Sequence, residues 1–120
     1  MCSKTDIGRK GEKLAGIYLA DRGYKIVAYN WRYKHKEIDI LAYDGDWLVV
    51  VEVKLRSSDS YGDPSEFVTL KKQRFLIEAA EAYLDTIPSA PEVRFDVISI
   101  VGSEGNYNIE HITDAFNPNP

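Results

Sequence analysis

Two short segments, Glu37-Ile38-Asp39 and Glu52-Val53-Lys54, combine residue types that could do chemistry together. Both lie in otherwise apolar stretches, where three carboxylates and one ammonium group are unusual. Carboxylates that lie close together repel one another unless a cation sits among them or they share a proton. Hard oxygen ligands suit Mg²⁺, Mn²⁺ or Ca²⁺, and Mg²⁺ held by few carboxylates is the usual ion for handling phosphates. The pattern therefore indicates a divalent-metal site with a lysine beside it.

The spacing of the two segments predicts a β-hairpin with a tight turn at residues 44–46. A two-residue turn at Gly45-Asp46 pairs residues whose numbers sum to 91, and one at Asp44-Gly45 pairs residues that sum to 89. Because side chains alternate between the faces of a strand, either odd sum is expected to gather all four charged groups on one face. A three-residue turn would separate them. The alternative is a solvated strand face with an ordinary cross-strand ion pair between Glu37 and Lys54.

The elements that must position these residues follow from hydrophobic spacing and turn signals. Apolar and small residues three and four apart predict a helix over 6–22, with Gly23 as its C-terminal cap. A second helix is predicted from a Thr69 cap to residue 84, and strands are predicted at 24–31, 37–43, 47–55, 93–101 and 107–112. The order αβββαββ predicts an α/β domain, residues 1–120, with a central mixed sheet flanked by helices. The loop at 57–63 is expected to connect elements or to close over a substrate.

Composition narrows the class of protein. The chain has 120 residues and a single cysteine, which excludes a disulfide framework and a cysteine-ligated zinc site. No apolar run approaches the ~20 residues of a membrane span, and the start of the chain has no apolar signal core, so we expect a cytoplasmic protein without membrane contact. The net charge of -4 argues against strong non-specific DNA binding, although the basic residues concentrate in the first 36 positions.

Asp39 followed across a hairpin by Glu52-Val53-Lys54 resembles the PD-(D/E)xK nuclease signature, and the predicted order of elements resembles the restriction-endonuclease-like core. More closely, the chain resembles the YraN-type family of small bacterial predicted endonucleases. The matching stretches run in order along nearly the whole chain, at residues 8–12, 37–39, 51–56, 72–74, 94–97 and 111–116. The resemblance implies a metal-dependent endonuclease that hydrolyses phosphodiester bonds in branched or damaged DNA. It also implies Mg²⁺ or Mn²⁺ as the cofactor, and related resolvase-like nucleases imply a homodimer.

The resemblance also assigns roles to individual residues. Asp39 and Glu52 would bind the ion, together with the backbone carbonyl of Val53. Lys54 would act on the attacking water or on the transition state. The supporting residues would be Glu12 on the first helix, Glu37, and Gln73 on the second helix.

Two groups of cations are candidates for contact with nucleic acid. The segment 31–36 interleaves aromatic residues with cations next to the acidic strand, a pattern that suits phosphate contact and base stacking. A second group lies near the start of the second helix. The predicted contacts are Arg32, Lys34, Lys36, Lys71, Lys72 and Arg74. The alternatives are a polar hairpin connection with core aromatics for the first group, and a solvated helix face for the second.

Two other functions remain open on the sequence. A catalytically weak or inactive domain could bind nucleic acid as an accessory module, which the net acidity favours. An adaptor could use the acidic C-terminal half to bind another protein. His111 has no metal or nucleophile partner in the sequence and is expected to form hydrogen bonds at a strand end.

Overall fold

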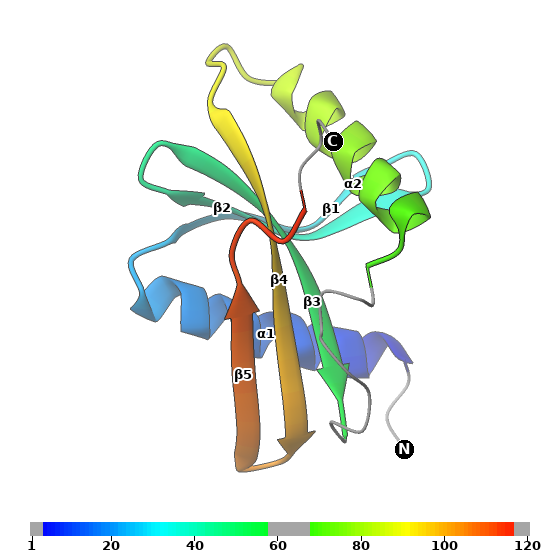
Figure 1. Ribbon diagram of the computed structural model, residues 1–120, viewed down its shortest axis with the longest axis vertical. Helices are drawn as coiled ribbons and strands as arrows, with labels where there is room; N and C mark the ends of the chain where they lie inside the picture. The colour runs from blue at the N-terminus through cyan, green and yellow to red at the C-terminus, as the bar shows by residue number, and fades with distance from the viewer. Residues whose placement is uncertain (1–3, 58–67, 117–120) are drawn as a thin grey trace.

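The computed structural model describes residues 4–57 and 68–116, with the backbone alone described for residues 4–8. Within this part of the chain the elements follow the predicted order αβββαββ (Figure 1). The helices are α1 (Lys4–Asp21) and α2 (Leu70–Leu84), and the strands are β1 (Lys25–Tyr33), β2 (Lys36–Asp44), β3 (Trp47–Arg56), β4 (Glu92–Ser103) and β5 (Asn106–Ile112). Neither described helix has the length and apolar character to cross a bilayer. Apart from Ser57, the loop predicted at 57–63 lies outside the described residues.

Both helix caps lie where the sequence predicts them. Gly23 has a φ of 89°, and its amide donates to the carbonyl of Ala20 while the amide of Tyr24 donates to the carbonyl of Leu19. These two bonds form a Schellman motif, which favours glycine because the left-handed backbone strains residues with a side chain. At the start of α2, the hydroxyl of Thr69 accepts from the amide of Lys72 at 3.1 Å. The cap thereby satisfies one of the unpaired amides of the first turn.

The sheet has the order β1-β2-β3-β4-β5, with β3 at its centre. β3 and β4 are parallel, whereas the other neighbours are antiparallel. A parallel pair needs a crossover connection, and α2 lies within it. Asp44 pairs with Trp47 and Ile40 with Val51, so the hairpin turns at Gly45-Asp46 with the index sum of 91. This is one of the two predicted registers.

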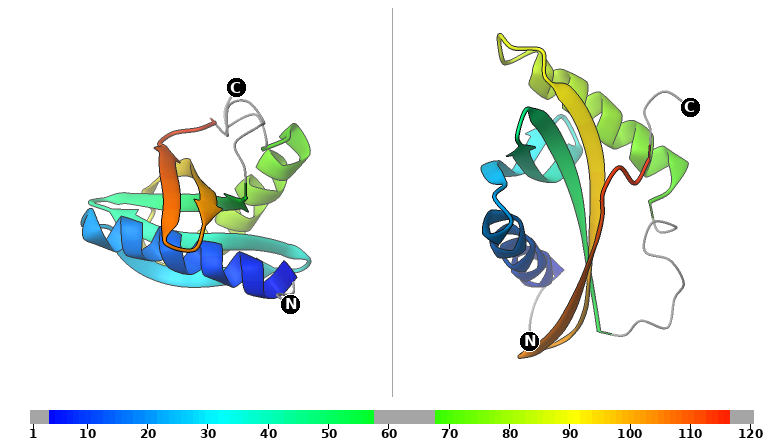
Figure 2. Two further views of the ribbon diagram at one scale, coloured as in Figure 1. Left: turned by 90° about the horizontal axis from the view of Figure 1, so that it is seen from below. Right: turned by 60° about the vertical axis from the view of Figure 1, so that its left-hand side comes forward.

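The two helices cover opposite faces of the sheet (Figure 2, left). Ala15 and Leu19 of α1 pack against strand residues that include Val49 and Val51, and we call this side the α1 face. Leu76 of α2 packs on the other side, the α2 face, against residues that include Val50. Strand β3 is therefore apolar on both faces along most of its length, which explains its nearly continuous apolar run.

Strand β2 breaks the alternation of its side chains at Asp39. Ile38 packs on the α2 face, whereas Ile40 packs on the α1 face, although the two residues are two positions apart. Asn30 on β1 has a left-handed backbone, with a φ of 51°, and the register would place it opposite Asp39. The described backbone pairing of β2 with β3 extends only as far as Ile40 and Val51. The two strands separate beyond that pair, and we call this point the fork.

The prediction that all four charged groups share one face is therefore wrong. It assumed an unbroken pleat from residue 37 to residue 43. The break at Asp39 leaves Glu37 on the α1 face, where it lies close to Glu12 of α1. Glu52 lies on the α2 face, where it forms an ion pair with Lys72 of α2.

A buried charge network joins β4 to the segment after β5. Asp96 is 1% exposed and accepts two hydrogen bonds from Arg94, both at 2.9 Å. It also lies 2.7 Å from Nε2 of His111 and accepts from the amide of Asp114. Burial alone would raise the pKa of Asp96, but the contacts with His111 and Arg94 outweigh burial and lower it. The network ties the C-terminal segment to the sheet.

We predict that Asp96→Ala lowers the free energy of unfolding by roughly 3–5 kcal/mol, because it leaves the half-buried guanidinium of Arg94 without its main partner. Urea unfolding at neutral pH measures the change. Glu92→Ala, an exposed substitution at the start of the same strand, is the matched control and is expected to change stability by less than about 0.5 kcal/mol. Equal effects of the two substitutions would contradict the structural role of the network.

Candidate metal centre

Asp39 lies at the fork and links the two separated strands. Its Oδ2 accepts a hydrogen bond from the backbone amide of Val53 at 2.9 Å. A carboxylate oxygen thus takes the place that a backbone carbonyl of β2 would hold in a continued ladder. Because the N–H and C=O of one residue in a strand point to the same side, the carbonyl of Val53 also points toward the fork.

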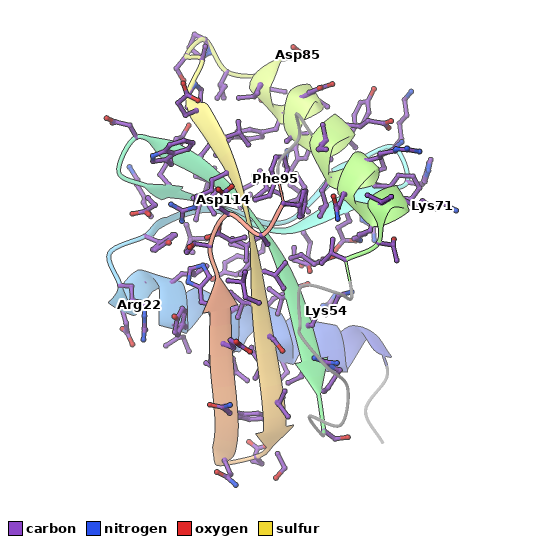
Figure 3. The ribbon with its side chains drawn as sticks, in the orientation of Figure 1. Arg22, Lys54, Lys71, Asp85, Phe95 and Asp114 are labelled. Carbon is purple, nitrogen blue, oxygen red and sulfur yellow. The ribbon has the colours of Figure 1, made fainter. Side chains whose placement is uncertain are left out.

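Glu52 and two lysines form a group on the α2 face. Glu52 is 3% exposed, and its Oε2 lies 3.9 Å from Nζ of Lys54 and 3.4 Å from Nζ of Lys72. The same Oε2 is buried without a hydrogen-bond partner in the described part of the chain. Figure 3 labels Lys54 on β3 and Lys71 near the start of α2. The structure thus brings Glu52 and Lys54 together as predicted, and it adds Lys72 from α2.

Glu12 and Glu37 form a second acidic group on the α1 face. Glu12, on α1, is 9% exposed. One ligand atom from each of Glu12, Glu37 and Asp39 lies within 4.8 Å of the others. The side-chain amide of Asn30 donates to Glu12 at 2.7 Å and to Glu37 at 2.6 Å. Glu37 also lies 3.4 Å from the guanidinium of Arg32.

Asp39 connects the two acidic groups electrostatically. Burial raises the pKa of Asp39 strongly, and the hydrogen bond and charge of Glu52 raise it further. The amide of Val53 opposes this shift, and the charge of Glu12 adds to it. The pKa of Glu12 is likewise raised by burial and by the charges of Glu37 and Glu52, against the hydrogen bond from Asn30. Three elements, α1, β2 and β3, therefore bring carboxylates close enough to share a cation or a proton.

Gln73 has a local contact at the start of α2. Its side-chain amide nitrogen donates to the backbone carbonyl of Val68 at 3.0 Å. This bond ties the first turn of α2 to the residue that precedes the Thr69 cap. A contact between Gln73 and the carboxylates stays a prediction.

The cations of the segment 31–36 have different surroundings from one another. Trp31 and Tyr33 pack against the core on the α2 face, so these two aromatic residues belong to the core, the alternative that the sequence left open. Nζ of Lys36 lies 3.1 Å from Glu78, and its side chain is 10% exposed. Arg32 and Lys34 are exposed.

The surface beside this segment carries balanced charge. A groove of about 520 Å³ lies between the segment and α2. Three cations and three acids line it, namely Arg32, Lys34, Lys36, Glu78, Glu81 and Asp85. Because the charges balance, the lining of the groove does not by itself favour the binding of a phosphate group.

The cations at the start of α2 also divide into two kinds. Lys71 and Arg74 are exposed, whereas Lys72 pairs with Glu52 and therefore belongs to the carboxylate site as well. The sequence predicts Lys72 only as a nucleic-acid contact, because the fold alone shows that this turn of α2 lies over β3.

Asn30 is the residue at the site that the sequence analysis misses. An asparagine in the middle of a strand rich in aromatic and β-branched residues is a usable signal, since asparagine is depleted in strands and tolerates a left-handed backbone. His111 has the strand-end hydrogen-bonding role expected of it, and its partner is Asp96.

Comparison with known proteins identifies the family. The model of the family described as "Uncharacterised protein family UPF0102" matches residues 11–100. The chain belongs to this family. UPF0102 is the YraN family, so the resemblance seen in the sequence is confirmed. The match includes Glu12, the fork and the whole of α2.

Similar UPF0102 proteins occur in several bacteria. A UPF0102 protein of Chlorobium phaeobacteroides is 47% identical over 118 residues, covering 92% of this chain and 94% of its own length. One from Bacteroides thetaiotaomicron is 42% identical over 118 residues, covering 98% of each chain. One from Flavobacterium johnsoniae is 44% identical over 120 residues, covering 97% of this chain and 98% of its own length. These names give the UPF0102 family and no reaction.

We predict that Asp39→Asn stabilises the metal-free protein at pH 8, by about 1–2 kcal/mol. The pKa of Asp39 is raised in the folded protein, so the folded state binds its proton more tightly than the unfolded state does. Stability is therefore lost as the pH rises from about 4, the ordinary aspartate pKa, toward the raised value. Asparagine has no proton to lose and retains an oxygen for the Val53 amide.

Urea unfolding in the presence of a metal chelator, at pH 8 and at pH 4, measures the free energy of unfolding of both proteins. The stability gained by Asp39→Asn is expected to vanish at pH 4. Asp46→Asn in the exposed hairpin turn is the control for removing one negative charge. A loss of stability in Asp39→Asn that is equal at both pH values would show that the carboxylates at the fork do not repel one another.

Proposed function

We propose that this UPF0102 protein is a divalent-metal-dependent endonuclease that hydrolyses phosphodiester bonds in DNA. The observation that carries the proposal is the position of Asp39. At the fork, Asp39 meets Glu12 and Glu37 on one side and Glu52 on the other. Lys54 lies next to Glu52. A partly buried group of carboxylates with an adjacent ammonium offers ligands for a divalent ion and a positive charge for the transition state, both of which serve metal-assisted phosphodiester hydrolysis.

The donor atoms fit a hard divalent cation. Oε2 of Glu52 is buried and accepts no hydrogen bond from the described residues. We propose Asp39, Glu52 and the carbonyl of Val53 as the residues that hold Mg²⁺ or Mn²⁺, with Glu12 and Glu37 in support. All of these ligands are oxygen atoms, which Mg²⁺ and Mn²⁺ prefer. A bound ion would act as a Lewis acid and lower the pKa of a coordinated water.

The remaining chemistry falls to side chains of the chain itself. Lys54 is half-buried and is held beside Glu52 at 3.9 Å. From there its ammonium would orient the attacking water, or stabilise negative charge on the pentacovalent transition state. Lys72, at 3.4 Å from Glu52, adds a second cation at the same carboxylate. Two ammonium groups beside the site favour a substrate with a negatively charged phosphate.

DNA contacts outside the site are assigned to the exposed cations. Arg32 lies near the end of β1, Lys34 lies on the β1–β2 turn, and Lys71 and Arg74 lie near the start of α2. The net charge is -4, so we expect recognition of DNA structure, such as branched or damaged sites, in place of tight binding to any duplex. A homodimer would extend this small surface.

A second candidate is an accessory module that binds nucleic acid without turnover. The observation that favours it is the pairing of Glu52 with both Lys54 and Lys72. These lysines partly balance the carboxylates without any metal ion, so the acidic group can be stable in a domain that binds no metal.

We predict that the wild type binds Mn²⁺ or Mg²⁺ and cleaves DNA, and that Asp39→Asn/Glu52→Gln does neither. Calorimetric titration measures metal binding. A panel of linear, nicked, flapped and four-way-junction DNA measures cleavage, with an expected loss of at least about 100-fold. Asp46→Asn/Glu110→Gln removes two exposed carboxylates and is the matched control.

The outcomes of this experiment separate the two candidates. Metal binding without cleavage of any DNA in the panel would favour the accessory module. A wild type that binds no metal, with or without DNA, and cuts nothing would show that the carboxylates have a structural role.

We further predict that Lys54→Ala lowers the cleavage rate by about 100-fold while metal affinity is retained, since the ammonium serves the water or the transition state and is not a ligand. Removing a cation beside Glu52 is expected to leave metal affinity unchanged or to raise it, because less positive charge then opposes the ion. Lys25→Ala, at an exposed position at the start of β1, is the control. Equal losses of cleavage in both variants would place Lys54 outside the reaction.

A further inference from the structure

Asn30 lies between two carboxylates. Among the described residues, it alone forms hydrogen bonds to both of them. Its Nδ2 donates to Oε1 of Glu12 at 2.7 Å and to Oε1 of Glu37 at 2.6 Å. Glu12 comes from α1 and Glu37 from β2, whereas Asn30 comes from β1. The side chain therefore connects three elements at a single nitrogen atom.

The chemistry of the amide suits this position. A side-chain amide has two N–H donors on one nitrogen, and each carboxylate here takes one of them. An ionised carboxylate has no proton to donate and only accepts hydrogen bonds, so the two N–H groups of one amide can serve two ionised carboxylates at once. A lysine would neutralise one charge of the pair and would compete with a metal ion. The neutral amide orients both carboxylates without cancelling their charge, whereas Glu37 also forms an ion pair with the exposed guanidinium of Arg32 at 3.4 Å.

The backbone of Asn30 indicates that the position is under constraint. Its φ of 51° is left-handed, in the middle of a strand. This conformation costs a residue with a side chain roughly 1–2 kcal/mol, and asparagine tolerates it better than most. The same residue lies opposite the point where β2 changes the face of its side chains. The left-handed residue thus coincides with the place where the acidic groups meet Asp39.

We infer that Asn30 is a positioning residue for the metal centre: it holds Glu12 and Glu37 in place beside Asp39, so that the carboxylates are arranged before a cation binds. This inference rests on the proposed metal-dependent function. It adds a residue that contributes no ligand atom and acts only through the two carboxylates.

The test uses Asn30→Gly, because glycine adopts the left-handed backbone without strain and removes the side chain that carries the amide. Titration with Mn²⁺ alone, followed by calorimetry, is expected to show about tenfold weaker binding, while the urea midpoint of the metal-free protein stays close to that of the wild type. Asp114→Gly is the matched control, since Asp114 also has a left-handed backbone, with a φ of 53°, and uses its backbone amide in the Asp96 network. Its Mn²⁺ affinity is expected to stay within twofold of the wild type.

A second measurement separates positioning from general support of the fold. If Asn30 acts through Glu37, then Asn30→Gly and Glu37→Ala combined weaken Mn²⁺ binding by less than the product of their single effects. If Asn30→Gly does not fold, Asn30→Ser replaces it in the same titration, because a hydroxyl has one proton and can donate to only one of the two carboxylates.

The outcomes distinguish the inference from the function on which it rests. If the wild type binds Mn²⁺ and the affinity of Asn30→Gly lies within twofold of it, the role of Asn30 is overturned and the metal centre is not. A fall in the urea midpoint with unchanged Mn²⁺ affinity also overturns it, because that is the result of a purely structural role. Wild-type protein that binds no Mn²⁺ overturns the proposed metal centre, and the inference with it.

Discussion

The hydrogen bond from the amide of Val53 to the carboxylate of Asp39 is the contact on which the site depends. Where β2 and β3 separate, the backbone groups of β3 lose the partners that a continued ladder would give them. A buried amide without an acceptor is costly, and a side-chain oxygen satisfies it here. The same bond holds Asp39 near the plane of the sheet, between its two faces. The fork and the arrangement of carboxylates therefore have one physical origin.

Charge around the fork is balanced in two different ways. On the α2 face, the ammonium groups of Lys54 and Lys72 lie beside Glu52. On the α1 face, the neutral amide of Asn30 joins Glu12 to Glu37. An ammonium group lowers the net negative charge, whereas an amide only orients it. Glu12 and Glu37 carry more negative charge than the exposed Arg32 offsets, which would support a cation held at the fork by Asp39 and Glu52. The two ammonium groups on the α2 face would attract a phosphate.

A separate network stabilises β4 and the C-terminal segment. Asp96 contacts Arg94, His111 and the backbone amide of Asp114, so both of its carboxylate oxygens have hydrogen-bond partners within the protein. Glu52 differs, since one of its oxygens is buried and accepts no hydrogen bond from the described residues. Both are buried acids on neighbouring parallel strands. The contrast between a satisfied and an unsatisfied carboxylate separates the structural acid from the acid assigned to the metal.

The sequence by itself determined the order of the elements, the caps at Gly23 and Thr69, and a tight turn within residues 44–46, whose register the structure then decided. These features depend on interactions between residues that are close in the chain, so composition and spacing carry them. The match of Asp39 and Glu52-Val53-Lys54 to a nuclease signature was also visible, because it is a matter of residue identity and spacing.

Only the tertiary structure decided which carboxylates lie on which face. Strict alternation predicted one shared face, but the left-handed backbone at Asn30 and the separation of β2 from β3 shift Glu37 away from Glu52. The approach of Lys72 to Glu52, and of Glu12 to Asp39, depends on how α2 and α1 pack on the sheet. Such contacts join residues about 20 or more positions apart in the chain, and no local pattern specifies them, because packing of the whole sheet sets the distance.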